Sequence, residues 1–162
     1  MIHLKTAALL EKSLLMGGSI GRASESQMNA LSEYGIKIGQ AFQIQDDILG
    51  SFGDVKVTGK STDGDIKEGK KTMLTLGALK LASPEQKEIL GKYLGNDKLT
   101  PDEVEKVRDV FRESGALEYA RKTMTDLLVE GQEALDKAEP PLVEKYKQYM
   151  LDLSNFLVKR DY

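Results

Sequence analysis

Helical periodicity through nearly all of the chain is the sequence feature that most constrains its fold. Apolar residues recur at three- or four-residue steps, while the apolar–polar alternation typical of half-buried strands is hard to find. Two capping boxes with proline at the first helical position, at residues 83–86 and 100–103, mark helix starts. We therefore predict an all-α chain of about seven helices, at residues 2–16, 25–49, 72–81, 84–93, 101–113, 116–138 and 142–158.

Glycines divide and modify this helical pattern. Gly17-Gly18 is expected to end the first helix. Gly35 and Gly39 lie one turn apart in the second helix, where they lower the helix propensity but allow a neighbouring element to pack closely. Residues 50–72 contain five glycines, many charges and little periodicity, so we interpret this stretch as a long functional loop.

Length and composition narrow the class of protein. The chain of 162 residues suffices for one domain, and its 40% hydrophobic and 30% charged content is typical of a soluble globular protein. It holds no apolar run of about 18 residues, so we expect no stable membrane insertion. The lack of cysteine excludes disulfides and suits a cytoplasmic protein, while a net charge of −3 argues against a nucleic-acid partner.

Two adjacent aspartates, Asp46 and Asp47, lie in an apolar stretch that includes Phe42 and Ile48. Burying a lone carboxylate costs several kcal/mol unless a partner compensates for it. Gln43 projects on the same side of the helix, since positions three and four residues apart share a face. Two interpretations stay open from this stretch alone: a solvated helix end, or a site where both carboxylates face a cation.

The charged stretch that follows adds both carboxylates and lysines. Such a mixture can hold Mg²⁺ together with a diphosphate, because Mg²⁺ takes one or two carboxylates plus phosphate oxygens and lysines neutralise the remaining charge. A solvated polar loop is the alternative. The acidic residues are Asp54, Asp63, Asp65 and Glu68, and the lysines are Lys56, Lys60, Lys67, Lys70 and Lys71.

Near the N-terminus, Lys5 and Thr6 interrupt an apolar helical run. By themselves they are most simply a surface lysine and a threonine that bonds back to a helix carbonyl. Their place in a longer series of motifs gives them a second interpretation.

The order of these motifs resembles that of the trans-type isoprenyl diphosphate synthases, which include the farnesyl and geranylgeranyl diphosphate synthases, and the archaeal-type branch in particular. The series is KTAAL at 5–9, GQAFQIQDDILG at 39–50, FGD at 52–54, GK at 59–60 and DIKEGKKT at 65–72. The resemblance covers essentially the whole chain and implies a partial helical bundle of the isoprenoid (terpenoid) synthase fold. It also implies Mg²⁺-dependent condensation of an allylic diphosphate with isopentenyl diphosphate, and a homo-oligomer such as a homodimer.

For the diphosphate and its metal, the resemblance implies roles for acidic and basic residues. Asp46 and Asp47 match the family's second aspartate-rich motif, with Asp46 as the direct Mg²⁺ ligand, and Asp65 matches an acidic residue near the metals. The third aspartate of that motif falls at Gly50, which leaves one carboxylate fewer. The lysines that hold the allylic diphosphate map onto Lys5, Lys60 and Lys70.

For the hydrocarbon, the resemblance implies a second group of residues. Thr6 and Gln43 match residues whose oxygens line the developing allylic cation, so that Lys5, Thr6 and Gln43 form the expected catalytic set. Phe42 matches an aromatic residue beside the substrate hydrocarbon.

The family's first aspartate-rich motif, DDxxD, does not occur in this sequence. The family's full domain is also roughly twice this length. We therefore expect residues 1–162 to be the C-terminal half of one all-α synthase domain, with 50–72 as its charged active-site loop, and to be inactive alone. Two alternatives stay open: a non-catalytic or regulatory subunit of a heteromeric prenyl synthase, and a helical interaction protein.

Overall fold

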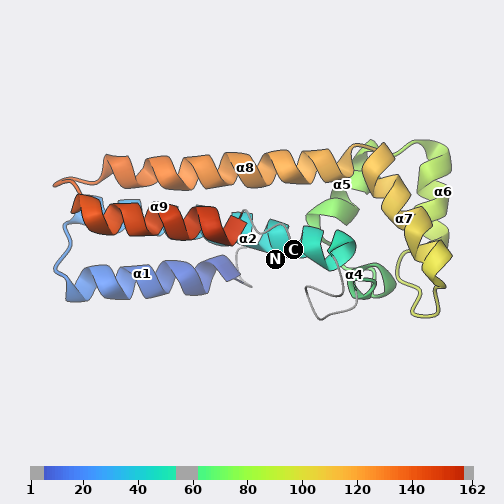
Figure 1. Ribbon diagram of the computed structural model, residues 1–162, viewed down its shortest axis with the longest axis horizontal. Coiled ribbons are helices and arrows are strands. Elements are labelled where there is room, and N and C mark those ends of the chain that lie inside the picture. The colour runs from blue at the N-terminus through green and yellow to red at the C-terminus, as the bar shows by residue number, and fades with distance from the viewer. Residues whose placement is uncertain (1–5, 54–61, 159–162) are drawn as a thin grey trace. The chain divides into compact units, whose positions relative to one another are not determined.

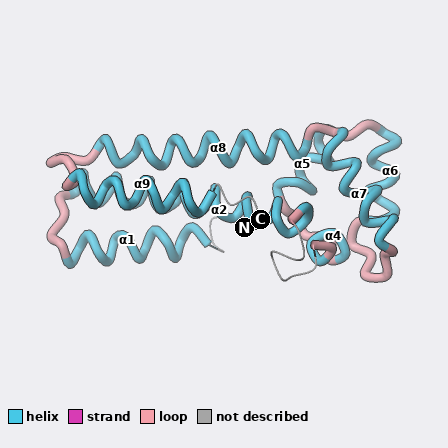
Figure 2. Tube along the Cα trace, in the orientation of Figure 1, coloured by secondary structure: helices cyan, strands magenta, loops and turns pink. Residues whose placement is uncertain are grey.

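The computed structural model describes residues 6–53 and 62–158, and in this part of the chain it contains helices and no strand. The all-α prediction is therefore confirmed (Figures 1 and 2). The helices are α1 (Ala8–Ile20), α2 (Glu25–Phe52), α4 (Gly64–Lys67), α5 (Met73–Leu81), α6 (Pro84–Tyr93), α7 (Pro101–Glu113), α8 (Ala116–Ala134), the short 3₁₀ helix η2 (Leu135–Lys137) and α9 (Glu144–Val158).

Local capping chemistry sets the start of two helices where the sequence predicts it. The Ser83 hydroxyl accepts from the Gln86 amide at 3.2 Å and opens α6. The Thr100 hydroxyl accepts from the Glu103 amide at 3.3 Å and opens α7. In both boxes the third helical side chain also accepts from the backbone amide of the capping residue, so two otherwise unpaired donors are satisfied at each end.

The prediction that Gly17-Gly18 ends the first helix is wrong, because α1 continues to Ile20. A Cβ at Gly18 would lie 2.7 Å from Met28 Sδ and 3.0 Å from Leu31 Cδ1. Gly18 therefore provides room for the side chains of α2 and does not terminate α1. The helix ends instead where Arg22 takes a φ of 55°.

The stretch at 50–72 is less irregular than expected. Helix α2 continues to Phe52, and the short helix α4 forms within the stretch, so the described residues hold eight α-helices where seven were predicted. Residues 54–61 lie outside the described part of the chain. The predicted helix at 116–138 is α8 followed by η2, and the helix predicted from 142 begins at Glu144.

The residues divide into two compact units, Met1–Gln43 with Thr123–Asp161 and Ile44–Lys122 with Tyr162. In the first unit, α1, α9 and the parts of α2 and α8 that belong to it run side by side (Figure 1). The hydroxyl of Tyr34 donates to the carbonyl of Met150 at 2.7 Å, and burial raises the pKa of Tyr34 to about 12. The buried core consists of Tyr34, Ile38, Ala41, Leu128, Leu135 and Val158.

Helices α1 and α2 approach each other at the two glycines singled out in the sequence. A Cβ at Gly39 would lie 2.5 Å from Ala7 Cα, and a Cβ at Gly35 would lie 2.8 Å from Glu11 Cα. The prediction that these glycines admit a close neighbour is confirmed. The buried Glu11 carboxylate accepts a hydrogen bond from the Ser32 hydroxyl at 2.7 Å in the same contact.

The second unit contains α4 to α7, the final turns of α2 and the first turns of α8. Helix α7 buries an apolar stripe of Val104, Val107, Val110 and Phe111. Phe111 packs edge-to-face on Phe52, with ring centroids 6.4 Å apart. Gly69 and Gly95 both have positive φ, and a Cβ at Gly69 would lie 2.9 Å from Gly95 Cα. The buried apolar residues of this unit include Ile48, Ile66, Leu74, Ala78, Leu90, Leu99, Val104, Val107, Val110 and Phe111.

Helix α9 exposes an apolar stripe to solvent. Tyr146, Tyr149, Leu153 and Phe156 are 50–62% exposed and recur at three- and four-residue steps. In the described part of the chain, none of the helices is both long enough and apolar enough to cross a membrane.

Replacing Gly39 with alanine tests the α1–α2 contact. The added methyl meets the backbone of Ala7, which cannot rotate away, so we expect Gly39→Ala to destabilise the protein by about 1–3 kcal/mol in urea unfolding. Gly17→Ala is the matched control, because nothing lies within 4 Å of its Cβ position. It should stabilise helix α1 by roughly 0.5–1 kcal/mol. Equal unfolding midpoints for the two variants would contradict the observed packing.

Candidate functional site

Thr6 and Gln43 form a direct hydrogen bond, with the Thr6 hydroxyl donating to Gln43 Oε1 at 2.6 Å. Gln43 is only 3% exposed. Thr6 and Ala7 lie in a π-type turn directly before α1, and such turns are frequent at functional sites. Gln43 lies one turn after Gly39 on α2, and Thr6 directly precedes Ala7. The close packing of Ala7 on Gly39 therefore also brings the side chains of Thr6 and Gln43 together.

A pocket of about 460 Å³ in the first unit adjoins this pair. Its wall is mostly apolar, with Thr6 and Ser13 as its polar residues, and so it suits a hydrocarbon with a polar end. Besides the expected Thr6 and Phe42, sequence analysis missed several lining residues. Leu10 and Ser13 follow Thr6 at four and seven residues, so a helical projection could have found them. The lining residues are Thr6, Leu9, Leu10, Ser13, Gly39, Phe42 and Leu157.

The paired aspartates differ in environment. Asp46 is exposed, whereas Asp47 is 7% exposed, although both lie in the last two turns of α2. The simple interpretation that both carboxylates are solvated at a helix end is therefore wrong for Asp47. Asp46 is the more exposed member of the pair.

Asp65 lies against the turn of α2 that follows this pair. A Cβ built on Gly50 would lie 2.9 Å from Asp65 Oδ2. The other oxygen, Oδ1, accepts from the Lys70 ammonium, and this hydrogen bond is the main cause that raises the pKa of Lys70 above its ordinary value. The Asp65 carboxylate thus lies close to the space into which a third aspartate at position 50 would extend.

The carboxylates of the second unit suit Mg²⁺, although in the described residues they do not form a complete set of protein ligands around one ion. In the described residues, no group of three or more histidine, aspartate or glutamate side chains is placed to hold a metal. Mg²⁺ commonly takes one or two carboxylates and fills its shell with water and substrate phosphates. An exposed Asp46 with a lysine-bearing segment nearby in the sequence fits that mode of binding.

Not every expected site residue can be located. Lys5 and Lys60 lie outside the described residues, as do Asp54 and Lys56. Lys67 pairs with Asp63 at 3.4 Å.

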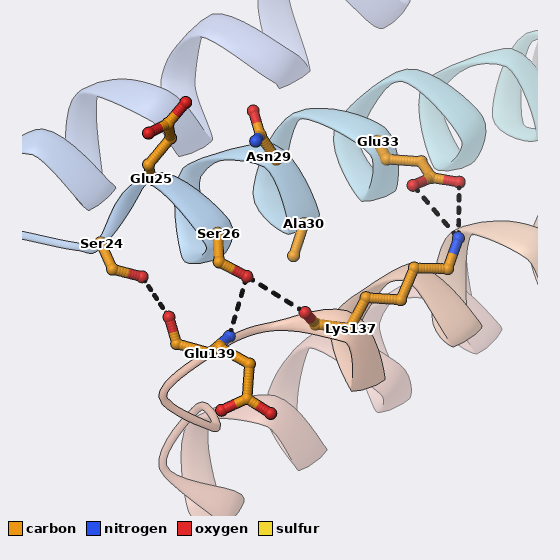
Figure 3. Close-up of a pocket in the computed structure, with 8 residues that line it drawn as sticks. All are labelled: Ser24, Glu25, Ser26, Asn29, Ala30, Glu33, Lys137 and Glu139. Atoms are coloured by element: carbon orange, nitrogen blue, oxygen red, sulfur yellow. Dashed lines mark hydrogen bonds and ion pairs between the residues drawn. The ribbon is translucent and has the colours of Figure 1, made fainter.

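A second pocket, of about 530 Å³, lies at the start of α2 (Figure 3). Ser26 accepts from the Glu139 amide at 3.0 Å and donates to the Lys137 carbonyl at 3.2 Å, while Lys137 pairs with Glu33 at 3.1 Å. These contacts fasten α2 to the connection between η2 and α9, and we assign them a structural role. The pocket is lined by Ser24, Glu25, Ser26, Asn29, Ala30, Glu33, Lys137 and Glu139.

Together these features define an all-α protein with helix-borne carboxylates, a lysine–aspartate pair and an apolar pocket beside a threonine–glutamine pair. The chain belongs to the polyprenyl synthetase family, whose model matches residues 1–111. It is 37% identical to the geranylgeranyl diphosphate synthase of Saccharolobus solfataricus over 99% of this chain and 48% of that protein. It is 40% identical to the short chain isoprenyl diphosphate synthase of Methanocaldococcus jannaschii over 75% of this chain and 36% of that protein.

Solved structures agree with this assignment and confirm the all-α isoprenoid synthase fold. The geranylgeranyl pyrophosphate synthetase of Pyrococcus horikoshii matches with a TM-score of 0.88 and 34% identity, over 99% of this chain and 48% of that one. A geranylgeranyl pyrophosphate synthase from Corynebacterium glutamicum, complexed with isoprenyl diphosphate and magnesium, matches with a TM-score of 0.88 and 31% identity. That match covers 98% of this chain and 45% of the other.

The chain therefore spans about half the length of the S. solfataricus relative and of both of these structures. The covered fractions give the length of this chain relative to those proteins, but they do not give which part of each protein it matches. The expectation that the chain is the C-terminal half is thus not borne out by them and stays a prediction.

Restoring an aspartate at position 50 tests whether Asp65 lies beside it. Gly50→Asp places a second carboxylate near Asp65, whereas Gly50→Asn adds the same shape without charge. At neutral pH we expect Gly50→Asp to unfold about 1 kcal/mol more easily than Gly50→Asn in urea, from like-charge repulsion. The difference should shrink when Asp65→Asn is added and when acid protonates the carboxylates. Equal stability at neutral pH would show that the two positions do not meet.

Proposed function

We propose that the protein of which this chain forms about half is a Mg²⁺-dependent trans-prenyltransferase. It condenses an allylic diphosphate with isopentenyl diphosphate to give a longer trans-polyprenyl diphosphate. The allylic carbon–oxygen bond breaks as diphosphate departs, and the double bond of isopentenyl diphosphate attacks the allylic carbon. The resulting cation then loses one proton to the released diphosphate, which completes the product. This chain by itself is proposed to be inactive, since it lacks the DDxxD motif.

The observation that carries the proposal is the position of Asp65. Its carboxylate lies beside Gly50, one turn along α2 from the Asp46–Asp47 pair, and bonds to Lys70. Asp65, with Lys70 bonded to it, thus lies at the end of the helix that carries Asp46 and Asp47. That combination suits a dianionic leaving group held through a divalent cation.

At the diphosphate end, Asp46, Asp47 and Asp65 are assigned to hold Mg²⁺. When bound, Mg²⁺ would neutralise the charge that develops on the departing diphosphate. Lys70, and with it Lys5 and Lys60, are assigned to the diphosphate oxygens. Lysine is protonated at neutral pH, and the bond to Asp65 raises the pKa of Lys70 further, so its ammonium is charged.

At the hydrocarbon end, the Thr6–Gln43 pair is assigned to stabilise the allylic cation. Their oxygens are held by their mutual hydrogen bond, so they require little rearrangement as positive charge develops. Phe42 and the apolar pocket wall are assigned to the hydrocarbon and exclude water that would otherwise trap the cation. Gln43 and Asp46 lie three residues apart on α2, which is the basis for assigning both groups to one reaction.

A second candidate function is a subunit that binds another helical polypeptide to complete a heteromeric synthase. The apolar stripe on α9 favours it, because a contiguous apolar helix face in water usually marks an interaction surface. The same surface would serve a homo-oligomer. In either assembly the stripe is expected to be covered.

Magnesium-dependent binding of inorganic pyrophosphate to this chain tests the proposed function. By isothermal titration calorimetry, we expect Asp46→Ala to weaken binding at least about tenfold, because a ligand is lost from the ion that bridges to phosphate. Asp97→Ala removes an exposed carboxylate from a turn of the same unit and serves as the control. Undiminished binding by Asp46→Ala, or binding by wild type that ignores Mg²⁺, would refute the metal assignment.

Light scattering after size-exclusion chromatography tests the second candidate. We expect the chain to associate, alone or with the half of the S. solfataricus synthase that it does not match. Leu153→Lys with Phe156→Lys should reduce the associated fraction, because each places a charge in the stripe. Gln148→Lys is the control for each of the two substitutions made singly, since it adds one positive charge on α9 outside the stripe and can pair with Asp152. If the wild-type chain is monomeric both alone and with that half of the synthase, the subunit function is refuted.

A further inference from the structure

Arg108 of α7 connects two segments of the second unit that are distant in sequence. Its side chain is 16% exposed. Nε donates to the carbonyl of Ser51 at 2.7 Å, and Nη2 donates to the hydroxyl of Thr62 at 2.8 Å and to Asp63 Oδ1 at 2.9 Å. Nη1 donates to Glu105 one turn earlier on α7, at 3.0 Å. One guanidinium therefore joins the end of α2, the start of α4 and its own helix.

The contact with Ser51 has a specific electrostatic role. Ser51 lies in the last turn of α2, where carbonyl groups have no donor within the helix and the helix dipole presents its negative end. The Arg108 guanidinium donates a hydrogen bond to the Ser51 carbonyl and also offsets the partial negative charge of this helix end. Ser51 is 1% exposed, so water has little access to this position.

The contacts with Thr62 and Asp63 hold the segment that leads into α4. Asp65 follows two residues after Asp63, and its carboxylate lies beside Gly50 of α2. Arg108 thus fixes α4 to the same end of α2 that carries the paired aspartates. A planar guanidinium can reach all these acceptors at once, whereas a lysine ammonium cannot.

We propose that Arg108 is a positioning residue for the diphosphate site, which sets the distance from Asp46 and Asp47 on α2 to Asp65 and Lys70. This inference rests on the proposed function, because it takes those four residues as the magnesium–diphosphate group. Arg108 itself contacts neither aspartate of the pair. It acts through the end of α2 and the start of α4.

The competing interpretation is that Arg108 only stabilises the second unit. A purely stabilising contact would change the unfolding midpoint and leave the affinity of the folded protein for its ligand unaltered. Arg112 provides a matched comparison. It lies one turn along α7 and also bonds to Glu105, at 2.7 Å, and to Asp109. Its guanidinium lies 5.1 Å from the centroid of the Phe52 ring at the end of α2, but none of these contacts reaches the segment that leads into α4.

The test measures binding of Mg²⁺ with inorganic pyrophosphate to the full chain, at a temperature where circular dichroism shows every variant folded. We expect Arg108→Gln to weaken binding about tenfold or more, Arg108→Lys to fall between it and wild type, and Arg112→Gln to bind as wild type does. In an Asp65→Asn background, adding Arg108→Gln should have little further effect, because the carboxylate that it positions has lost its charge.

Wild-type affinity for Arg108→Gln, or equal losses for Arg108→Gln and Arg112→Gln, would overturn the positioning role while leaving the proposed function intact. Full additivity with Asp65→Asn would also overturn it. A wild-type chain that binds no Mg²⁺–pyrophosphate would instead overturn the proposed function, and the positioning role with it. Unfolding midpoints for all variants separate lost stability from lost affinity.

Discussion

The backbone contact between α1 and α2 is the constraint on which the first unit depends. Gly35 and Gly39 present no side chain, so the backbone of α1 at Glu11 and Ala7 occupies the space where two Cβ atoms would lie. This approach buries Gln43 beneath Thr6 and so forms their hydrogen bond. If larger side chains at positions 35 and 39 held the two helices apart, the Gln43 amide would be exposed to water. The pocket beside it would also lose one wall.

At the other end of α2 the controlling interaction is electrostatic. Asp47 is buried, Asp65 lies against the same helix end, and negative charge also comes from the helix dipole. Lys70 bonds to Asp65, and Arg108 bonds to the carbonyl of Ser51. The protein thus balances part of the negative charge with its own cations. We propose that Mg²⁺ would supply further positive charge there when the anionic diphosphate of the substrate binds.

Much of the fold could be predicted because its signals are local. The capping boxes at residues 83–86 and 100–103 act within four residues of sequence, and both helices begin where those boxes predict. The failures arose where a distant partner decided the outcome. A glycine such as Gly18 is typical of a helix C-terminus, yet here it makes room for the side chains of Met28 and Leu31 while the helix continues. Local propensity could not distinguish these two uses of glycine.

In the candidate site too, some features could be predicted from the sequence and others depend on contacts between distant residues. The motif order indicated the family, and the resemblance to that family suggested Thr6, Phe42, Gln43, Asp46, Asp47, Asp65 and Lys70 as site residues. Sequence could not indicate that Arg108 bonds to a carbonyl 57 residues away or that Leu157 lines the pocket of Thr6. Such contacts depend on how helices pack, and packing depends on the fit of many side chains at once. The sequence by itself thus determined most of the helices and the family, because those signals are local, and only the tertiary structure decided which groups meet.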